Sequence, residues 1–204
     1  MPKTEEQNQK ILDKRKEEIL EAALEEFSRK GYSGAKISDI VKRAGISQGL
    51  IYHYYKSKDE LYLAVIEKSL DSSMILSTIV AQYNLKGWNA LVAMTEWIIQ
   101  WLKSGGEGKL RFFFIQQAAM LEPKPEGVKQ ALAKSMRMNE FTANLIKEAQ
   151  EEGMVIEGDP LKITFLYWAL IHGIIMNYAT IENIGLERVG TIPEADIILR
   201  IIKK

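Results

Sequence analysis

Residues 47–54 combine side chains that can recognise the edge of a DNA base pair with others that can hold a phosphate. The amide of Gln48 offers a donor and an acceptor together, which matches the edge that adenine presents in the major groove. Gly49 lets a backbone approach closely, and Leu50 can contact a thymine methyl group. Three further polar tips in this segment can reach phosphate oxygens, those of Tyr52, His53 and Tyr54.

The charge distribution also points to a phosphate partner. The 204 residues hold 27 Lys and Arg against 27 Asp and Glu, so the net charge is zero. Residues 27–58, however, carry seven cations and one anion, which leaves the remainder at −6. A basic block of this kind is typical of nucleic-acid contact, although a solvated surface of a small helical domain explains it as well.

Two short helices joined by a tight turn are predicted to position these side chains. A first helix carries an apolar stripe up to Phe27 and closes near Lys30, because Gly31 follows. A second fits residues 38–44, and Gly45 supplies the turn. A third follows Ser47 and ends near residue 54. This is the plan of a helix-turn-helix, whose second helix enters the major groove.

Capping signals place the neighbouring helices. Ser57 and Glu60 have capping-box spacing, so a helix begins there and continues to Tyr83, and Lys58 adds a cation beside its free amides. The chain itself starts a helix at Thr4 or nearer Asp13. Glycine and proline divide the remainder into helical lengths, and no segment alternates at period two. The fold class predicted is all-α with about nine helices: an N-terminal three-helix bundle, then a larger helical domain.

At these residues the chain resembles the tetracycline-repressor (TetR) family of bacterial transcription regulators. The resemblance covers about residues 13–73, and it is carried by Gly31-Tyr32, Ile37-Ser-Asp-Ile40, Ala44-Gly45-Ile46-Ser47, Gly49 to Tyr55 and Lys58-Asp-Glu-Leu61. It implies phosphate contacts from Lys36, Ser47, Tyr52, His53 and Lys58, groove contacts from Gln48, Gly49 and Leu50, and a further DNA contact from Ser38. It also implies a homodimer that binds double-stranded operator DNA, a repressor role and release by a small-molecule effector.

One position departs from the family pattern. Where two threonines usually enter the second helix, this chain has Ala35-Lys36. Lys36 can contact phosphate through its charge, but it cannot accept a hydrogen bond from a helix amide. The cap must then come from elsewhere or from water.

The domain organisation expected is an N-terminal extension over 1–12, a DNA-binding domain over 13–73 and an effector-binding and dimerisation domain over 74–204. Aromatic, methionine and buried polar side chains of the last domain are candidates for a mostly apolar effector pocket, although most such residues are core in any helical domain. These candidates are Trp88, Trp97, Trp101, Phe113, Met136, Asn139, Trp168, His172 and Met176.

Residues 163–181 form an uncharged stretch of nineteen residues, close to the length of a membrane span. Polar residues interrupt it, and no other segment resembles a span, so burial between protein layers is favoured. Together with the last helix, which Thr191-Ile-Pro-Glu194 introduces, it predicts a four-helix dimer interface. The candidate interface residues are Tyr167, Leu170, Ile174, Tyr178, Ile197, Ile198, Ile201 and Ile202.

Two other classes of protein are weighed against a regulator. An enzyme is disfavoured because the chain has two histidines, no cysteine and no carboxylate cluster at metal-ligand spacing; no metal or cofactor is expected. A membrane-anchored or purely protein-binding helical module is disfavoured to a similar degree, and loss of duplex binding in Gln48→Ala with Tyr52→Ala would discriminate against it. The N-terminal segment lacks the apolar core of a secretory signal, so a cytoplasmic location is the default expectation.

Overall fold

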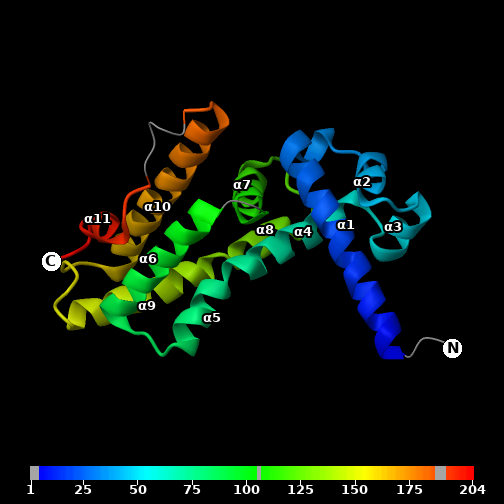
Figure 1. The fold of residues 1–204 in the computed structure, drawn as a ribbon. Helices are drawn as coiled ribbons and strands as arrows, with labels where there is room; N and C mark the ends of the chain where they lie inside the picture. Colours follow the sequence, from blue (N-terminus) through cyan, green and yellow to red (C-terminus); the bar gives the residue numbers. More distant parts are fainter. Residues whose placement is uncertain (1–4, 105–106, 187–191) are drawn as a thin grey trace. The chain divides into compact units, whose positions relative to one another are not determined.

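The computed structural model describes all residues except 1–4, 105–106 and 187–191, and the described residues are helical apart from their connections (Figure 1). The helices are α1 (Glu5–Gly34), α2 (Ile37–Ala44), α3 (Gln48–Tyr54), α4 (Lys58–Ser73), α5 (Ile75–Gln82), α6 (Gly87–Ser104), α7 (Glu107–Met120), α8 (Val128–Ala133), α9 (Met136–Glu151), α10 (Pro160–Asn183) and α11 (Ala195–Leu199). The all-α prediction is confirmed. One predicted helix is divided, since residues 57–83 form α4 and α5.

Tertiary contacts divide the chain into two compact units. The first unit comprises residues 1–72 with 106–134, and the second comprises residues 73–105 with 135–204. Helices α7 and α8 therefore fold with α1–α4, although about thirty residues of the second unit separate them in sequence.

An aromatic cluster lies at the centre of the first unit. The ring of Phe27 on α1 meets Tyr62 on α4 edge-on at 4.9 Å, and Phe114 on α7 packs against Tyr62 at 5.3 Å. Phe27, Tyr62 and Phe114 are each at most 1% exposed. Edge-to-face pairs of this kind add to the stabilisation from apolar burial, so these rings join the three helices firmly.

Helix α1 changes direction at the predicted position. Gly31 has φ 69° and ψ 171°, a left-handed value that favours glycine, and a further short turn reaches Gly34. At the other end, α1 extends to Glu5, so the described part of the expected N-terminal extension is helical. The predicted cap Thr4 lies outside the described residues.

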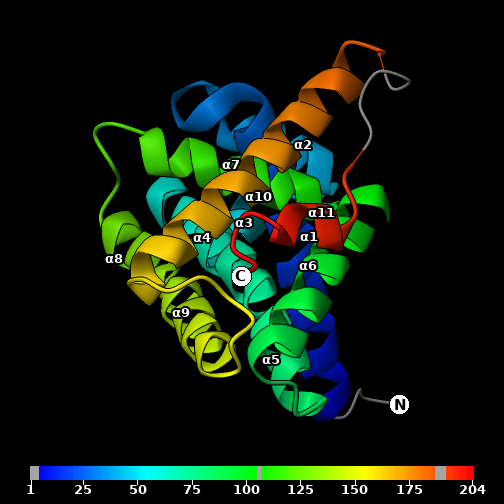
Figure 2. The ribbon, with the colours of Figure 1, turned by 90° about the vertical axis from the view of Figure 1, so that its left-hand side faces the viewer.

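In the second unit, α9 packs beside both α6 and α10 (Figures 1 and 2). The Tyr167 hydroxyl on α10 lies 3.0 Å from Thr95 Oγ1 on α6, and both residues are fully buried. The Trp168 indole donates to Thr142 Oγ1 on α9 at 3.2 Å. Buried polar groups thus pair across helices and fix the register of an otherwise apolar core.

Helix α10 is buried along one side only. From Thr164 on, its buried residues follow one another at three or four positions, and Ile163 lies beside the first of them: Ile163, Thr164, Tyr167, Ile171, Ile175 and Ala179. Among the described helices, α10 alone is long and apolar enough to cross a membrane by length and composition, a test that core helices of soluble proteins also pass. Only 33% of its apolar window is buried in the single chain. The sequence predicted that α10 is buried between two protein layers. In the single chain one side of α10 is buried and the other side is exposed.

Candidate nucleic-acid interface

The turn between α2 and α3 has the geometry that the sequence predicts. Gly45 has φ 63°, and the amide of Ile46 donates to the carbonyl of Val41 at 3.2 Å, which closes α2. Ser47 then caps α3, since its hydroxyl accepts the Leu50 amide at 3.2 Å. The local caps therefore fix where the second helix of the pair begins.

Helix α3 is anchored by one side and open on the other. Ile51 is 1% exposed and Tyr55 is 5% exposed, so these two side chains hold the helix to the core of the first unit. Tyr52 is 47% exposed, and the rings of His53 and Tyr54 meet edge-on at 5.6 Å. The predicted contact residues of this segment are exposed or half-buried: Ser47, Gln48, Gly49, Leu50, Tyr52, His53 and Tyr54.

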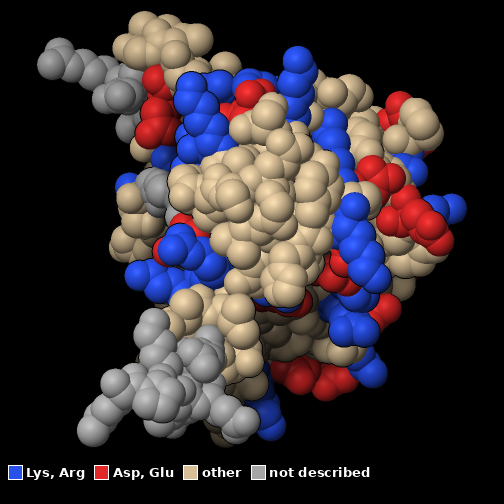
Figure 3. All heavy atoms as spheres, turned by 90° about the vertical axis from the view of Figure 1, so that its right-hand side faces the viewer, with Lys and Arg blue, Asp and Glu red and all other residues tan. Residues whose placement is uncertain are grey.

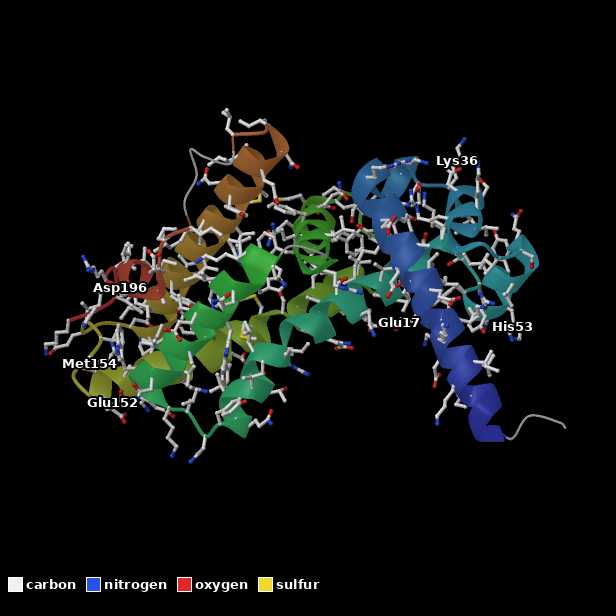
Figure 4. The ribbon with its side chains drawn as sticks, in the orientation of Figure 1. Glu17, Lys36, His53, Glu152, Met154 and Asp196 are labelled. Carbon is white, nitrogen blue, oxygen red and sulfur yellow. The ribbon has the colours of Figure 1, made fainter. Side chains whose placement is uncertain are left out.

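Figure 3 views the molecule from the side on which α2 and α3 lie. In this view Lys and Arg side chains, with Asp and Glu side chains among them, border a central area of uncharged residues. Figure 4 shows Lys36 at the start of α2 and His53 on α3, both on the outer side of the helix pair. Cations around an uncharged centre suit a surface that meets phosphates at its rim and bases at its centre.

Helix α2 begins without a side-chain cap. Lys36 is the residue before its first turn, its φ of −114° and ψ of 143° are extended, and its side chain makes no capping hydrogen bond. This confirms the expectation drawn from Ala35-Lys36. Lys36 and Ser38 are both exposed, so an external phosphate can reach the cation and the first amides of α2.

The start of α4 is capped on both sides. The Ser57 hydroxyl accepts the Glu60 amide at 3.1 Å, and the Glu60 carboxylate accepts the Lys56 amide at 2.6 Å. The return bond therefore ends one residue before the one expected of a capping box. Lys58 lies in the first turn that these bonds order.

A buried carboxylate that the motif analysis missed joins α1 to α2. Glu26 is 2% exposed, and its Oε1 accepts two hydrogen bonds from Arg43, at 2.9 and 2.7 Å. The Lys30 ammonium lies 2.8 Å from Glu26 Oε2 and 2.8 Å from Asp39. The hydrogen bond with Lys30 is the main cause that holds the pKa of Glu26 below its usual value. Burial opposes this shift, and the hydrogen bond with Arg43 adds to it.

Because of this network, only some cations of the basic block over residues 27–58 are available to an outside phosphate. Arg29, Lys30 and Arg43 face carboxylates, with Glu25 also bonded to Arg43. The other four cations of the block, Lys36, Lys42, Lys56 and Lys58, have no carboxylate within ion-pair distance among the described residues. The signal for Glu26 was present in the sequence, because it follows Ile19 by seven and Ala22 by four residues on the buried face of α1.

The candidate effector residues fall in both units of the chain. Phe113 lies on α7 in the first unit, and the others lie in the second. Met136 and Met176 are exposed, and Trp88 packs under Lys203. Trp97 lines an open groove of about 410 Å³ with Ile79, Gln82, Tyr83 and Leu85. The half-buried candidates are Trp88, Trp97, Trp101, Phe113, Asn139, Trp168 and His172.

Two of these side chains are neighbours on α10. The Trp168 and His172 rings lie 5.8 Å apart, and burial lowers the pKa of the His172 imidazole. His172 is therefore neutral at physiological pH and can both donate and accept a hydrogen bond.

The candidate dimer residues divide into core and surface. Tyr167, Ile198 and Ile202 are at most 2% exposed within one chain, so placing them on an interface was wrong: they pack in the core of the second unit. Leu170, Ile174 and Tyr178 are half-buried, whereas Ile197 and Ile201 are 52% and 43% exposed. Helix α11 has only five residues, and Thr191, expected to introduce it, lies outside the described residues.

The exposed apolar face of α10 is offset from the predicted one. Leu161, Phe165 and Met176 are 59%, 77% and 46% exposed. Because α10 is apolar around most of its circumference, its sequence periodicity did not reveal which side faces the core.

The fold and this surface define a helix-turn-helix DNA-binding protein. Residues 19–65 match the family described as bacterial regulatory proteins, tetR family. The HTH-type transcriptional repressor SCO4008 of Streptomyces coelicolor is 40% identical over 73 residues, 36% of this chain and 38% of that protein. The HTH-type transcriptional activator FasR of Mycolicibacterium smegmatis is 42% identical over 60 residues, 29% and 27% of the two chains. The matches thus span about a third of these relatives.

The whole chain has the same fold as a TetR-family regulator of known structure. The crystal structure of a TetR-family transcriptional regulator from Agrobacterium tumefaciens superposes with a TM-score of 0.72 at 17% identity, over 94% of this chain and 99% of that one. Residues 19–65 thus match the DNA-binding domain of the TetR family, and the whole chain shares the fold of this regulator. The family and these relatives are regulators, not enzymes.

Proposed function

We propose that this protein is a sequence-specific transcriptional repressor that binds operator DNA as a homodimer and leaves it when a small, mostly apolar effector binds. The observation that carries the proposal is the open side of α3, which Ser47 caps and Ile51 anchors. A rigid helix presenting uncharged polar side chains between cations can enter a major groove.

Base recognition falls to the first turn of α3. Gln48 and Gly49 are exposed there, and an added Cβ at Gly49 would meet nothing within 4 Å of the protein itself. The fold therefore does not require glycine at this position. Its lack of a side chain instead allows DNA to approach the helix backbone closely. Gln48 is assigned to an adenine edge and Leu50 to a thymine methyl group.

Phosphate contacts fall to the rim of the surface. Lys36, Ser38 and Ser47 lie at the starts of α2 and α3, and Lys58 lies at the start of α4. Tyr52, His53 and Tyr54 supply further polar tips on α3. Cations without a carboxylate partner release the counterions of DNA on binding, so affinity falls as salt rises from about 50 to about 200 mM.

The partner of the exposed α10 face is a second copy of the chain. A dimer places two α3 helices in successive major grooves when they lie about 34–36 Å apart. Phe165, Leu166 and Met176 are large, apolar and exposed on a helix of 24 residues, which supports a helix-to-helix contact. Ile197 and Ile201 add apolar surface from the C-terminal end of the chain.

The effector is assigned to the second unit, which is distinct from the DNA-binding surface. The groove beside Trp97 is apolar apart from Gln82, and the Tyr83 and Trp97 rings lie 6.3 Å apart. An aromatic or aliphatic molecule with one hydrogen-bonding group fits this lining. Release requires that the effector bind more tightly to a dimer with the wrong spacing of its α3 helices. A DNA-binding regulator acts in the cytoplasm.

The DNA-binding assignment is tested by selecting duplexes from a random-sequence pool with the wild-type protein. Gln48→Ala with Tyr52→Ala should abolish binding to the selected sequence while helicity and oligomeric state stay unchanged. Lys129→Ala with Gln130→Ala, exposed on α8, is the matched control. Unchanged binding by the first variant would refute the assignment.

Repression and release are tested with the selected sequence placed over a promoter. The protein should lower transcription, and apolar or aromatic compounds should restore it. A compound that restores transcription in the wild type but not in Trp97→Ala supports the groove. Increased transcription on adding the protein alone would make it an activator, as FasR is named.

A further inference from the structure

A lysine of α4 lies over an aromatic ring of α1. The Lys58 ammonium nitrogen is 4.6 Å from the centroid of the Tyr32 ring, within the range of a cation–π interaction. The same nitrogen lies 3.5 Å from the carbonyl oxygen of Ser33, at the limit of a hydrogen bond. The ring is therefore the main contact that holds this side chain.

The ring itself is fixed from its other sides. Tyr32 stacks on Phe27 at 6.5 Å and meets Tyr62 edge-on at 4.9 Å, so it rests on the aromatic cluster of the first unit. Its hydroxyl donates to the carboxylate of Asp59, the residue after Lys58. Burial, with help from this hydrogen bond, raises the pKa of Tyr32 to about 12, so the hydroxyl keeps its proton. The end of α1 and the start of α4 are thus joined through one side chain.

The charge of Lys58 has no carboxylate partner among the residues that the structure describes. No carboxylate oxygen lies within ion-pair distance of its nitrogen in the described part of the chain. Lys58 is half-buried, and burial lowers the pKa of its ammonium while the charge of Asp59 opposes this shift. An aromatic face attracts a cation without using up its hydrogen-bond donors, so the ammonium can still donate to an outside anion.

We propose that Tyr32 is a positioning residue that holds the Lys58 ammonium in place for a DNA phosphate. This inference rests on the proposed DNA-binding function and adds a residue outside α2 and α3 to it. Holding a lysine in one rotamer before binding removes part of the entropy that a free lysine loses when it contacts a phosphate. A merely structural Tyr32 would instead affect DNA binding only through folding.

The geometry is tested first without DNA, by nuclear magnetic resonance of the free full-length protein. A lysine over a ring face has its ε-CH₂ protons shifted upfield by the ring current. Lys58 should show this shift in the wild type and in Tyr32→Phe, and lose it in Tyr32→Leu. An unshifted Lys58 in the wild type overturns the inference whatever the DNA results are.

The role is tested next with a random-sequence duplex, because a phosphate contact does not depend on base sequence. Lys58→Gln should weaken binding about fivefold and reduce the slope of log affinity against log salt by about 1. Tyr32→Leu should lose part of this affinity, and it should have no further effect when Lys58 is already Gln. Tyr32→Phe should bind as the wild type does.

A fold-preserving substitution guards against a damaged core. Phenylalanine with a trifluorinated ring at position 32 keeps the shape of Tyr32→Phe but withdraws the negative charge of the ring face. Its duplex affinity should fall below that of Tyr32→Phe at equal melting temperature. Equal affinities, or a loss from Tyr32→Leu that persists in Lys58→Gln, would overturn the inference. Absence of any salt-dependent binding by the wild type would instead refute the proposed function, with the proton shifts still reporting the contact.

Discussion

Arg43 on α2 donates two hydrogen bonds to one oxygen of Glu26 on α1, and the carboxylate that receives them is almost fully buried. The two residues are 17 positions apart, so this contact sets the orientation of α2 against α1. The helix pair that presents the candidate DNA-binding surface is thereby held by an ion network as well as by apolar packing.

Replacing Glu26 should loosen this arrangement. We expect Glu26→Gln to lower the free energy of unfolding by about 2 kcal/mol, less than for a fully buried ion pair because its partners reach the surface. Chemical unfolding measures the change. Arg15→Gln, which breaks an exposed pair with Glu18 in α1, is the control and should change stability by about 0.5 kcal/mol or less.

The same carboxylate predicts a pH dependence. Its folded-state pKa lies below the ordinary value of 4.5, so its contribution to stability is complete above that value and is lost as the pH falls through the folded-state pKa. The difference in stability between wild type and Glu26→Gln should therefore shrink below pH 4.5. A difference that stays constant down to acid unfolding would contradict the ion network.

The missing cap of α2 can be restored. Lys36→Thr should raise the free energy of unfolding by about 1 kcal/mol, because the hydroxyl can accept an amide of the first turn. It should also reduce the salt slope of duplex binding by about 1, because one cation is removed. Lys36→Ala separates the two effects: it should reduce the slope equally without the gain in stability.

Gly87 has a left-handed backbone and lies against the carboxylate of Glu152. It has φ 45°, its amide donates to Glu148 at 2.8 Å, and an added Cβ would lie 2.1 Å from Glu152 Oε1. Two carboxylates of the α9 end thus cap the start of α6, with Trp88 donating to Glu152 at 2.9 Å. Figure 4 shows Glu152 at this end of the second unit.

Substitution at this capped start should therefore be costly. We expect Gly87→Ala to destabilise the protein by about 2 kcal/mol, from the left-handed backbone together with the displaced cap. Gly34→Ala, where the nearest atom would be 3.5 Å away, should be neutral or slightly stabilising. Thermal unfolding of both variants provides the measurement, and equal melting temperatures would show that the cap moves aside freely.

The α10 face can be tested by placing a charge on it. Phe165→Glu should raise the dissociation constant of the dimer about tenfold or more, because the interface would have to bury an unpaired carboxylate. Sedimentation over a concentration series measures it. Gln100→Glu, exposed on α6, should leave the dimer unchanged. If Phe165→Glu also leaves association unchanged, the dimer uses another surface.

Features that depend on neighbours within about four residues were predictable from the sequence. The helix start at Ser47, the cap at Ser57, the breaks at Gly31 and Gly45, and the uncapped Lys36 were predicted from local residue types and are present in the structure. The site residues on α3 follow from the same signals, because one buried residue, Ile51, decides which side remains open.

Relationships between distant residues were not predictable in the same way. Nothing in the local pattern pairs Glu26 with Arg43, or seats Lys58 over Tyr32. The orientation of α10 was also undetermined, because apolar residues on both sides give no periodic signal, and Tyr167 was wrongly assigned to its surface. Such contacts are set by tertiary packing, which a single sequence does not encode in its spacing.

The grouping of α7 and α8 with α1–α4 limits how this protein can be recombined. Transplanting residues 1–73 onto another regulator would leave Phe27 and Tyr62 without the Phe114 ring that packs between α1 and α4. A working chimaera would have to carry residues 107–134 as well, supplied from a separate part of the chain. Evolution by exchange of whole N-terminal segments would meet the same constraint. Substitutions in α1 or α4 at positions that line this aromatic cluster are therefore expected to be accompanied by substitutions in α7.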